Sequence, residues 1–120
     1  MRAFELEDIL PRFVEHCSKH LGLEHTPGIT ITDDALGDRE QPTFAYYDHE
    51  HDHITVSSRN RHAADVMRSL AHELVHARQS QRGELDHRSG RTGSPQENES
   101  NAVAGIIMRD FARLHPEIMG

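Results

Sequence analysis

The chain has 120 residues, enough for one compact hydrophobic core, so we expect a single domain over residues 1–120. Aspartate and glutamate outnumber lysine and arginine by 20 to 13, and the net charge of -7 leaves no broad basic surface for nucleic-acid phosphates. Acidic residues near the start and charges in every apolar run argue against a signal peptide and a membrane span.

Residues 5–21 carry apolar side chains at helical spacing, which predicts an amphipathic helix. Pro11 lies inside this pattern, so the helix either begins close to it, with proline in the first turn, or kinks there. The only cysteine, Cys17, sits among Phe13, Val14 and Leu21. We expect a packed, unpaired thiol in a reducing compartment, the cytoplasm.

Three short runs rich in strand-favouring residues follow, at residues 29–32, 43–47 and 54–57, with a polar loop over 33–42. The last two flank a polar turn and predict an antiparallel hairpin, hence a small antiparallel sheet in an α+β fold. His49, His51 and His53 alternate across that turn. They either gather a metal ion on one face of an extended segment or decorate a solvated turn, and we favour the turn.

The helical pattern returns over residues 58–81 and 96–115, separated by a long polar loop with several glycines. The first of these helices contains His72-Glu73-Leu74-Val75-His76. Histidines four residues apart lie on one face of a helix, where both imidazoles can reach one metal ion. The apolar residues of this helix occupy the opposite side, which leaves the histidines and Glu73 facing a cleft.

A catalytic zinc ion usually has three protein ligands and one open position, so another ligand is needed. Glu99 lies at the margin of the apolar stripe that we assign to the last helix from Val103, Ile106, Ile107, Phe111 and Leu114, and Glu97 lies far round from Glu99. We therefore predict Glu99 as the third ligand. Glu97 and His87 are the alternatives, and both glutamates also suit a helix start after Ser94 and Pro95.

Two segments carry a family resemblance: Leu70-Ala71-His72-Glu73-Leu74-Val75-His76 and Glu97-Asn98-Glu99-Ser100-Asn101-Ala102-Val103-Ala104. They resemble the gluzincin zinc metallopeptidases, most closely the ImmA/IrrE-type group, which pairs HExxH with a downstream Glu-Ala-Asn. Ser100 departs from the usual alanine and could hydrogen-bond a ligand or the backbone. The resemblance implies a minimal zincin fold: an N-terminal helix, a small sheet of about three strands, an active-site helix, a long loop and a C-terminal helix.

By the same resemblance, His72, His76 and Glu99 hold Zn²⁺ and Glu73 is the general base and acid. A substrate would extend along the edge strand, expected near residues 54–57. The group usually has an oxyanion-stabilising residue, for which this chain offers Tyr46, Tyr47, His87 and Arg109.

The expected function is thus a zinc-dependent metallopeptidase that hydrolyses a peptide or protein by metal-activated water, with a regulatory protein as one candidate substrate. Its target is recognised either through few contacts or with further subunits that complete the site. The alternative is a zinc-binding regulatory domain that binds a partner protein without cutting it, and a metal-free structural domain is a third hypothesis.

Overall fold

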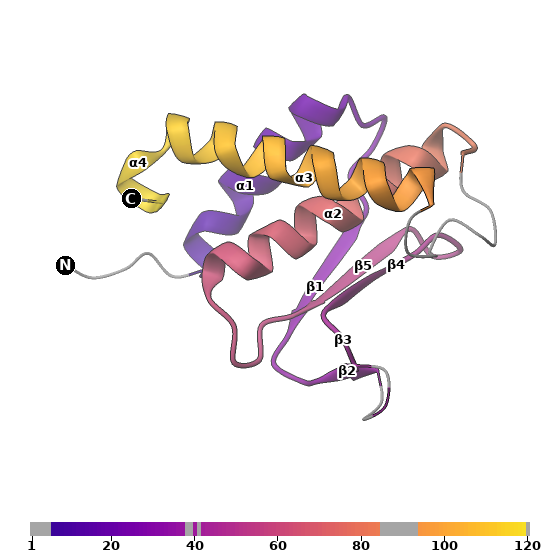
Figure 1. Cartoon of the computed structure of the whole chain (residues 1–120), viewed down its shortest axis with the longest axis horizontal. Helices are drawn as coiled ribbons and strands as arrows, with labels where there is room; N and C mark the ends of the chain where they lie inside the picture. The colour runs from indigo at the N-terminus through magenta and orange to yellow at the C-terminus, as the bar shows by residue number, and fades with distance from the viewer. Residues whose placement is uncertain (1–5, 38–39, 41, 85–93, 120) are drawn as a thin grey trace.

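This computed structural model describes residues 6–37, 40, 42–84 and 94–119, and it has the α+β fold expected from the sequence. A long helix is followed by short strands and then by the remaining helices (Figure 1). The elements in chain order are α1 (Leu6–Leu21), β1 (Gly28–Thr32), β2 (Leu36–Gly37), β3 (Pro42–Thr43), β4 (Ala45–Asp48), β5 (His53–Ser57), α2 (Ala63–Gln81), α3 (Pro95–Leu114) and α4 (Pro116–Met119).

The main sheet has the strand order β1-β5-β4. The predicted hairpin is confirmed, with β4 antiparallel to β5 and Ala45 opposite Val56. The expectation of a fully antiparallel sheet is wrong, because β1 runs parallel to β5, with Ile29 opposite Ile54. The connection between these two strands is long enough for a parallel return. Within it, β2 and β3 form a separate two-residue ladder in the segment expected to be loop.

Helix α1 buries one stripe of side chains: Ile9, Phe13, Cys17 and Leu21. It begins at Leu6, so Pro11 lies inside the helix, beyond the first turn. Gly22, at φ 64°, ends the helix, and its N–H donates to the Ser18 carbonyl at 2.9 Å. Cys17 is fully buried, as expected, and this burial raises the pKa of its thiol to about 12.

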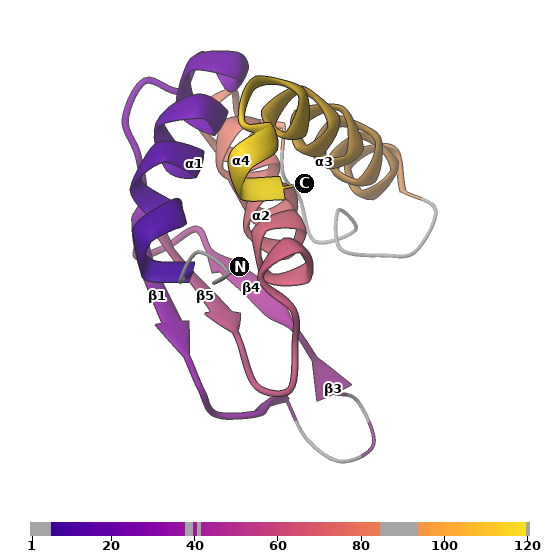
Figure 2. The ribbon, with the colours of Figure 1, turned by 90° about the vertical axis from the view of Figure 1, so that its left-hand side faces the viewer.

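The helices gather on one side of the sheet, with α2 next to the strands and α3 beyond it (Figures 1 and 2). Helix α2 lies at the centre, since it contacts β4 and β5 on one side and α1 and α3 on the others. Phe13 of α1 meets Phe111 of α3 edge to face, with ring centroids 5.1 Å apart. The other core residues of α2 and β5 are Ile54, Val56, Val66, Met67, Leu70, Ala71, Leu74 and Val75.

The buried side of α3 differs from the stripe expected from the sequence. Ile106 and Leu114 were assigned to the core but are 46% and 55% exposed. The buried positions are instead Ser100, Ala104, Ile107, Met108 and Phe111. The side of α3 that faces the core is therefore not the side expected from the sequence. As a result, a different glutamate of α3 points towards α2.

No helix in the described part of the chain combines the length and apolar character needed to cross a membrane.

Candidate metal centre

His72 and His76 lie on neighbouring turns of α2, and both are partly buried. Their ring centroids are 4.9 Å apart and the rings stand at 79° to each other. The flanking apolar residues of α2 face the core, so the helix holds both imidazoles on the side that meets the start of α3. Burial lowers the pKa of His72, although the nearby Glu97 opposes this effect.

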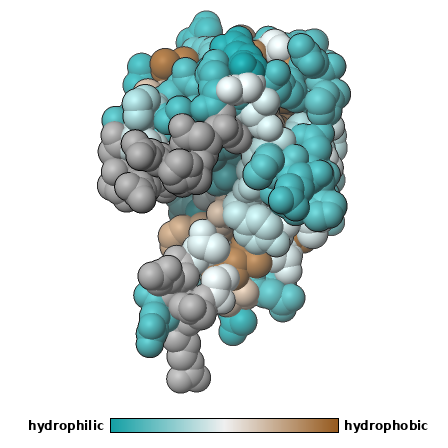
Figure 3. Space-filling model, turned by 90° about the vertical axis from the view of Figure 1, so that its right-hand side faces the viewer, coloured by the Kyte–Doolittle hydropathy of each residue, from teal (hydrophilic) through white to brown (hydrophobic). Residues whose placement is uncertain are grey.

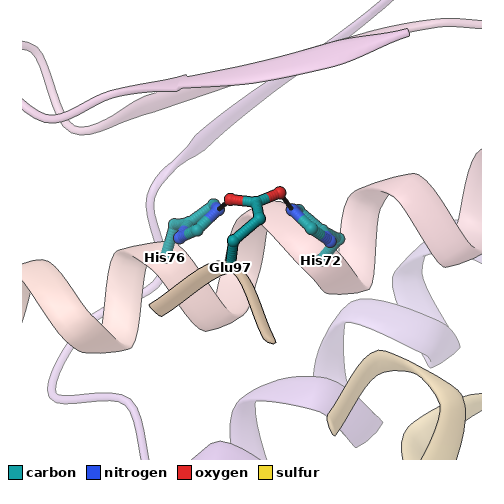
Figure 4. A group of neighbouring side chains, drawn as sticks. All are labelled: His72, His76 and Glu97. Carbon is teal, nitrogen blue, oxygen red and sulfur yellow. Dashed lines mark hydrogen bonds and ion pairs between the residues drawn. The ribbon is translucent and has the colours of Figure 1, made fainter. Parts of the chain in front are cut away.

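Glu97 reaches between the two histidines from the first turn of α3 (Figure 4). Its Oε1 lies 2.7 Å from His72 Nε2 and its Oε2 lies 3.1 Å from His76 Nε2. Ser94 caps this helix, because its Oγ accepts a hydrogen bond of 3.1 Å from the Glu97 N–H. Two imidazole nitrogens and a carboxylate thus converge, and they could hold one metal ion.

The choice of Glu99 as the third member of this cluster is corrected by the structure. On an ideal helix of 3.6 residues per turn, Glu97 lies about 20° from Ala104, at the centre of the buried side of α3. Glu99 lies about 140° away from Ala104 and cannot point in the same direction. Its carboxylate instead accepts a hydrogen bond from Gln79 Nε2 at 2.8 Å and lies 3.7 Å from Arg78 Nη2.

Glu73 borders a pocket beside the cluster. The residue is only 8% exposed, and burial, together with repulsion from Glu97, raises its pKa to about 8. The pocket has a volume of about 310 Å³, and its lining consists of Thr43, Phe44, Ala45, Arg68, Ser69, His72, Glu73, Glu97 and Asn101. A ligand in this space would meet the Glu73 carboxylate and the cluster together. On the face drawn in Figure 3, the surface is hollowed between a hydrophilic upper part and a lower part with hydrophobic patches.

Arg61 contacts two residues of the pocket lining, Phe44 and Ser69. Its guanidinium lies 4.4 Å from the centroid of the Phe44 ring, a side chain that is 62% exposed. The same group donates to the Ser57 carbonyl at 3.0 Å and to Ser69 Oγ at 2.7 Å. Arg61 thereby links three segments beside the pocket: the end of β5, the first turns of α2 and the segment before β4.

Two further residues contact His76 at Nδ1, the ring nitrogen that does not face Glu97. The sequence did not indicate Gln79 as a site residue, and it indicated Ser100 only as a departure from the family pattern. Gln79 Oε1 lies 2.8 Å from His76 Nδ1, and Ser100 Oγ lies 3.2 Å from the same atom. Ser100, noted above for its departure from alanine, is fully buried. The signal for Gln79 is its position three residues after His76, which places both side chains on one face of the helix.

The other candidates lie elsewhere. Tyr46, Tyr47 and Arg109 are not among the described residues that line the pocket, and the Tyr47 hydroxyl donates to Asp52 Oδ1 at 2.8 Å. His87 lies outside the described residues. The histidines of the hairpin turn point to different partners, since His51 contacts Asp48 at 2.6 Å and His53 contacts Thr30 at 2.7 Å.

No protein-family model, curated protein or solved structure gives a significant match to this chain. The chemistry of the cluster and its pocket therefore carries the evidence for function.

Proposed function

We propose that this protein is a zinc-dependent metallopeptidase in which His72, His76 and Glu97 hold the metal and Glu73 is the general base. The observation that carries the proposal is the approach of one carboxylate to two imidazole Nε2 atoms, at 2.7 and 3.1 Å, beside a pocket that Glu73 lines. The HExxH segment and its likeness to the ImmA/IrrE-type gluzincins support the same function.

The donor atoms suit zinc in kind and in number. Zinc in catalytic sites takes nitrogen and carboxylate ligands from three side chains and keeps a fourth position open. When bound, it would lower the pKa of a water molecule towards neutrality and polarise a peptide carbonyl. Glu97, placed near Glu73, also gives the cluster a concentration of negative charge that a divalent cation would offset.

Glu73 is well placed to move the proton. Glu73 lines the pocket, and no hydrogen bond to its carboxylate is found among the described residues. In its ionised form it could take a proton from water and pass it to the leaving amine of the substrate. The low exposure of Glu73 keeps bulk solvent from competing for that proton.

An extended substrate would lie along β4 in this proposal. The sequence pointed to residues 54–57, but β5 has partners on both sides, so its backbone groups are already used. Strand β4 is one of the two edge strands of the described sheet, and Ala45 at its start lines the pocket. A peptide added to this edge would bring its backbone past Glu73.

The proposed substrates are peptides or proteins, and the proposed compartment is the cytoplasm. A net charge of -7 disfavours nucleic acid as a partner. Cys17 is buried and unpaired, which suits a reducing environment.

The decisive test is the variant Glu73→Gln. We expect it to bind zinc with wild-type affinity and to lose peptide hydrolysis by about 100-fold or more, because general acid–base catalysis contributes at least that factor. Zinc content is measured by metal analysis, and cleavage of a peptide library is followed by mass spectrometry. The matched control is Glu15→Gln, an exposed glutamate of α1 that pairs with Lys19. Undiminished cleavage by Glu73→Gln would refute the proposed metallopeptidase function. A wild-type protein that binds zinc but cleaves no peptide would favour the alternative of a zinc-binding regulatory domain.

A further inference from the structure

The side chain of Gln79 is 1% exposed and lies between α2 and the start of α3. Its Nε2 donates to the Gln96 carbonyl at 3.0 Å and to Glu99 Oε1 at 2.8 Å. A carbonyl and a carboxylate only accept hydrogen bonds, so the nitrogen end of the amide must face them. The orientation of the Gln79 amide is therefore fixed, and Oε1 is left facing His76.

This orientation determines which nitrogen of His76 carries hydrogen. Gln79 Oε1 can only accept, and it lies 2.8 Å from His76 Nδ1, so Nδ1 is the donor. In a neutral imidazole, the other nitrogen then has a lone pair. That nitrogen is Nε2, which faces Glu97 Oε2 at 3.1 Å. Two electron-rich atoms at this separation call for a proton or a metal cation between them.

We propose that Gln79 and Glu99 are positioning residues that act in series on His76: Glu99 orients the Gln79 amide, and Gln79 sets the tautomer and direction of the imidazole. The inference rests on the proposed metal site and gives Glu99 a role other than that of ligand. A charged acceptor suits this role, because hydrogen bonds to carboxylates are stronger than those to neutral groups. Arg78 Nη2 lies 3.7 Å from the same oxygen, Glu99 Oε1.

The test uses Gln79→Met, which keeps the side-chain length and removes the amide. In the metal-free protein at about pH 8.5, where an ordinary histidine is neutral, ¹H–¹⁵N NMR should show His76 with hydrogen on Nδ1 in the wild type. We expect Gln79→Met to lose this preference and to bind zinc about 10- to 100-fold more weakly in chelator competition, the usual effect of removing such a support.

The matched control is Gln81→Met. Gln81 lies on the same helix and also bridges to backbone, since it accepts from the Glu24 N–H and donates to the His25 carbonyl, both at 2.9 Å. Its loss should leave the His76 tautomer and zinc affinity unchanged, even if stability falls. At Glu99, the order of effects should be informative: Glu99→Gln keeps an acceptor oxygen and should retain most zinc affinity, whereas Glu99→Met should behave like Gln79→Met.

Series action also predicts that the double variant Gln79→Met/Glu99→Met binds zinc no more weakly than Gln79→Met alone. Additive losses, or a wild-type tautomer in Gln79→Met, would overturn the inference. So would a loss in Glu99→Met as large as that in His72→Ala with the tautomer unchanged, since Glu99 would then be a ligand. The tautomer decides the inference even if the wild-type protein binds no zinc, a result that would refute the proposed function alone.

Discussion

Glu97 is the residue on which the candidate centre depends most. Its two carboxylate oxygens serve different histidines, and its backbone N–H is held by the Ser94 cap. The side chain is thus fixed at both ends before any ion is added. A residue held in this way loses little conformational freedom on binding a ligand, which favours affinity.

We predict that Glu97→Gln weakens zinc binding by at least about 100-fold, more than the loss of a supporting residue. The amide keeps the size of the side chain but replaces a charged ligand oxygen with a neutral one. Isothermal titration of the metal-free protein measures the change, with Glu99→Gln as the comparison. A larger loss in Glu99→Gln than in Glu97→Gln would restore Glu99 as the ligand.

At the scale of elements, the first turn of α3 has a mechanical role as well as a chemical one. Ser94 satisfies the Glu97 N–H, and Pro95 occupies the first helical position, where no N–H is needed. The same turn presents Gln96 to Gln79 and Glu97 to the histidines. Fraying of this turn would therefore move a metal ligand and its support together.

We expect Ser94→Ala to cost about 1 kcal/mol of stability, the usual effect of losing a helix cap. Zinc affinity should fall with it, because Glu97 lies in the turn that the cap stabilises. Urea unfolding of the metal-free protein gives the first quantity, and chelator competition gives the second. Ser94→Thr retains a capping hydroxyl and should restore both. If Ser94→Ala unfolds like the wild type, the cap is unimportant to α3.

The two site helices also show how far the sequence could lead. In α2 the apolar residues occupy one arc, so the cleft-facing side that carries His72, His76 and Glu73 could be predicted. In α3 the large apolar residues spread over one broad arc of about 200° on an ideal helix, and only packing against α2 decides that Ala104 is buried while Ile106 is exposed. The spacing of apolar residues consequently favoured Glu99, whereas the structure places Glu97 beside the histidines. Likewise, local patterns predicted the β4–β5 hairpin but not the parallel partner β1, which comes from distant chain segments.

At the scale of the whole molecule, α1 and α3 meet through a group of ionisable rings. His16 packs against Phe111, with ring centroids 5.5 Å apart, and its Nε2 is buried with no hydrogen-bond partner in the described structure. Burial and the neighbouring His20 lower the pKa of His16, against the attraction of Asp110. His115 adds a smaller repulsion. The folded protein therefore favours neutral His16.

The unfolding free energy depends on pH because folded and unfolded His16 bind protons with different affinities. Below its ordinary pKa of 6.5, His16 binds a proton more readily in the unfolded chain than in the folded one. Its contribution to stability is complete above this value and is lost as the pH falls towards the lower, folded-state pKa. We predict that His16→Phe reduces the decline in unfolding free energy between about pH 7.5 and pH 5.5.

Urea unfolding at the two pH values measures this decline. Some decline should remain in His16→Phe, because the pKa of His72 is lowered as well. His49→Gln, in the exposed turn between β4 and β5, should keep the full wild-type decline. Equal declines in the wild type and His16→Phe would show that His16 does not govern the acid sensitivity.

The candidate centre takes two side chains from α2 and one from α3, and Glu97 follows His76 by 21 positions in the sequence. An ion shared by these helices is bound only while α3 is docked, so ion binding and docking must strengthen each other by the same free energy. Binding of the metal ion would therefore stabilise the packing of α3 against α2. Conversely, a partner that separated α3 from α2 would release the ion and remove Glu97 and Asn101 from the pocket lining.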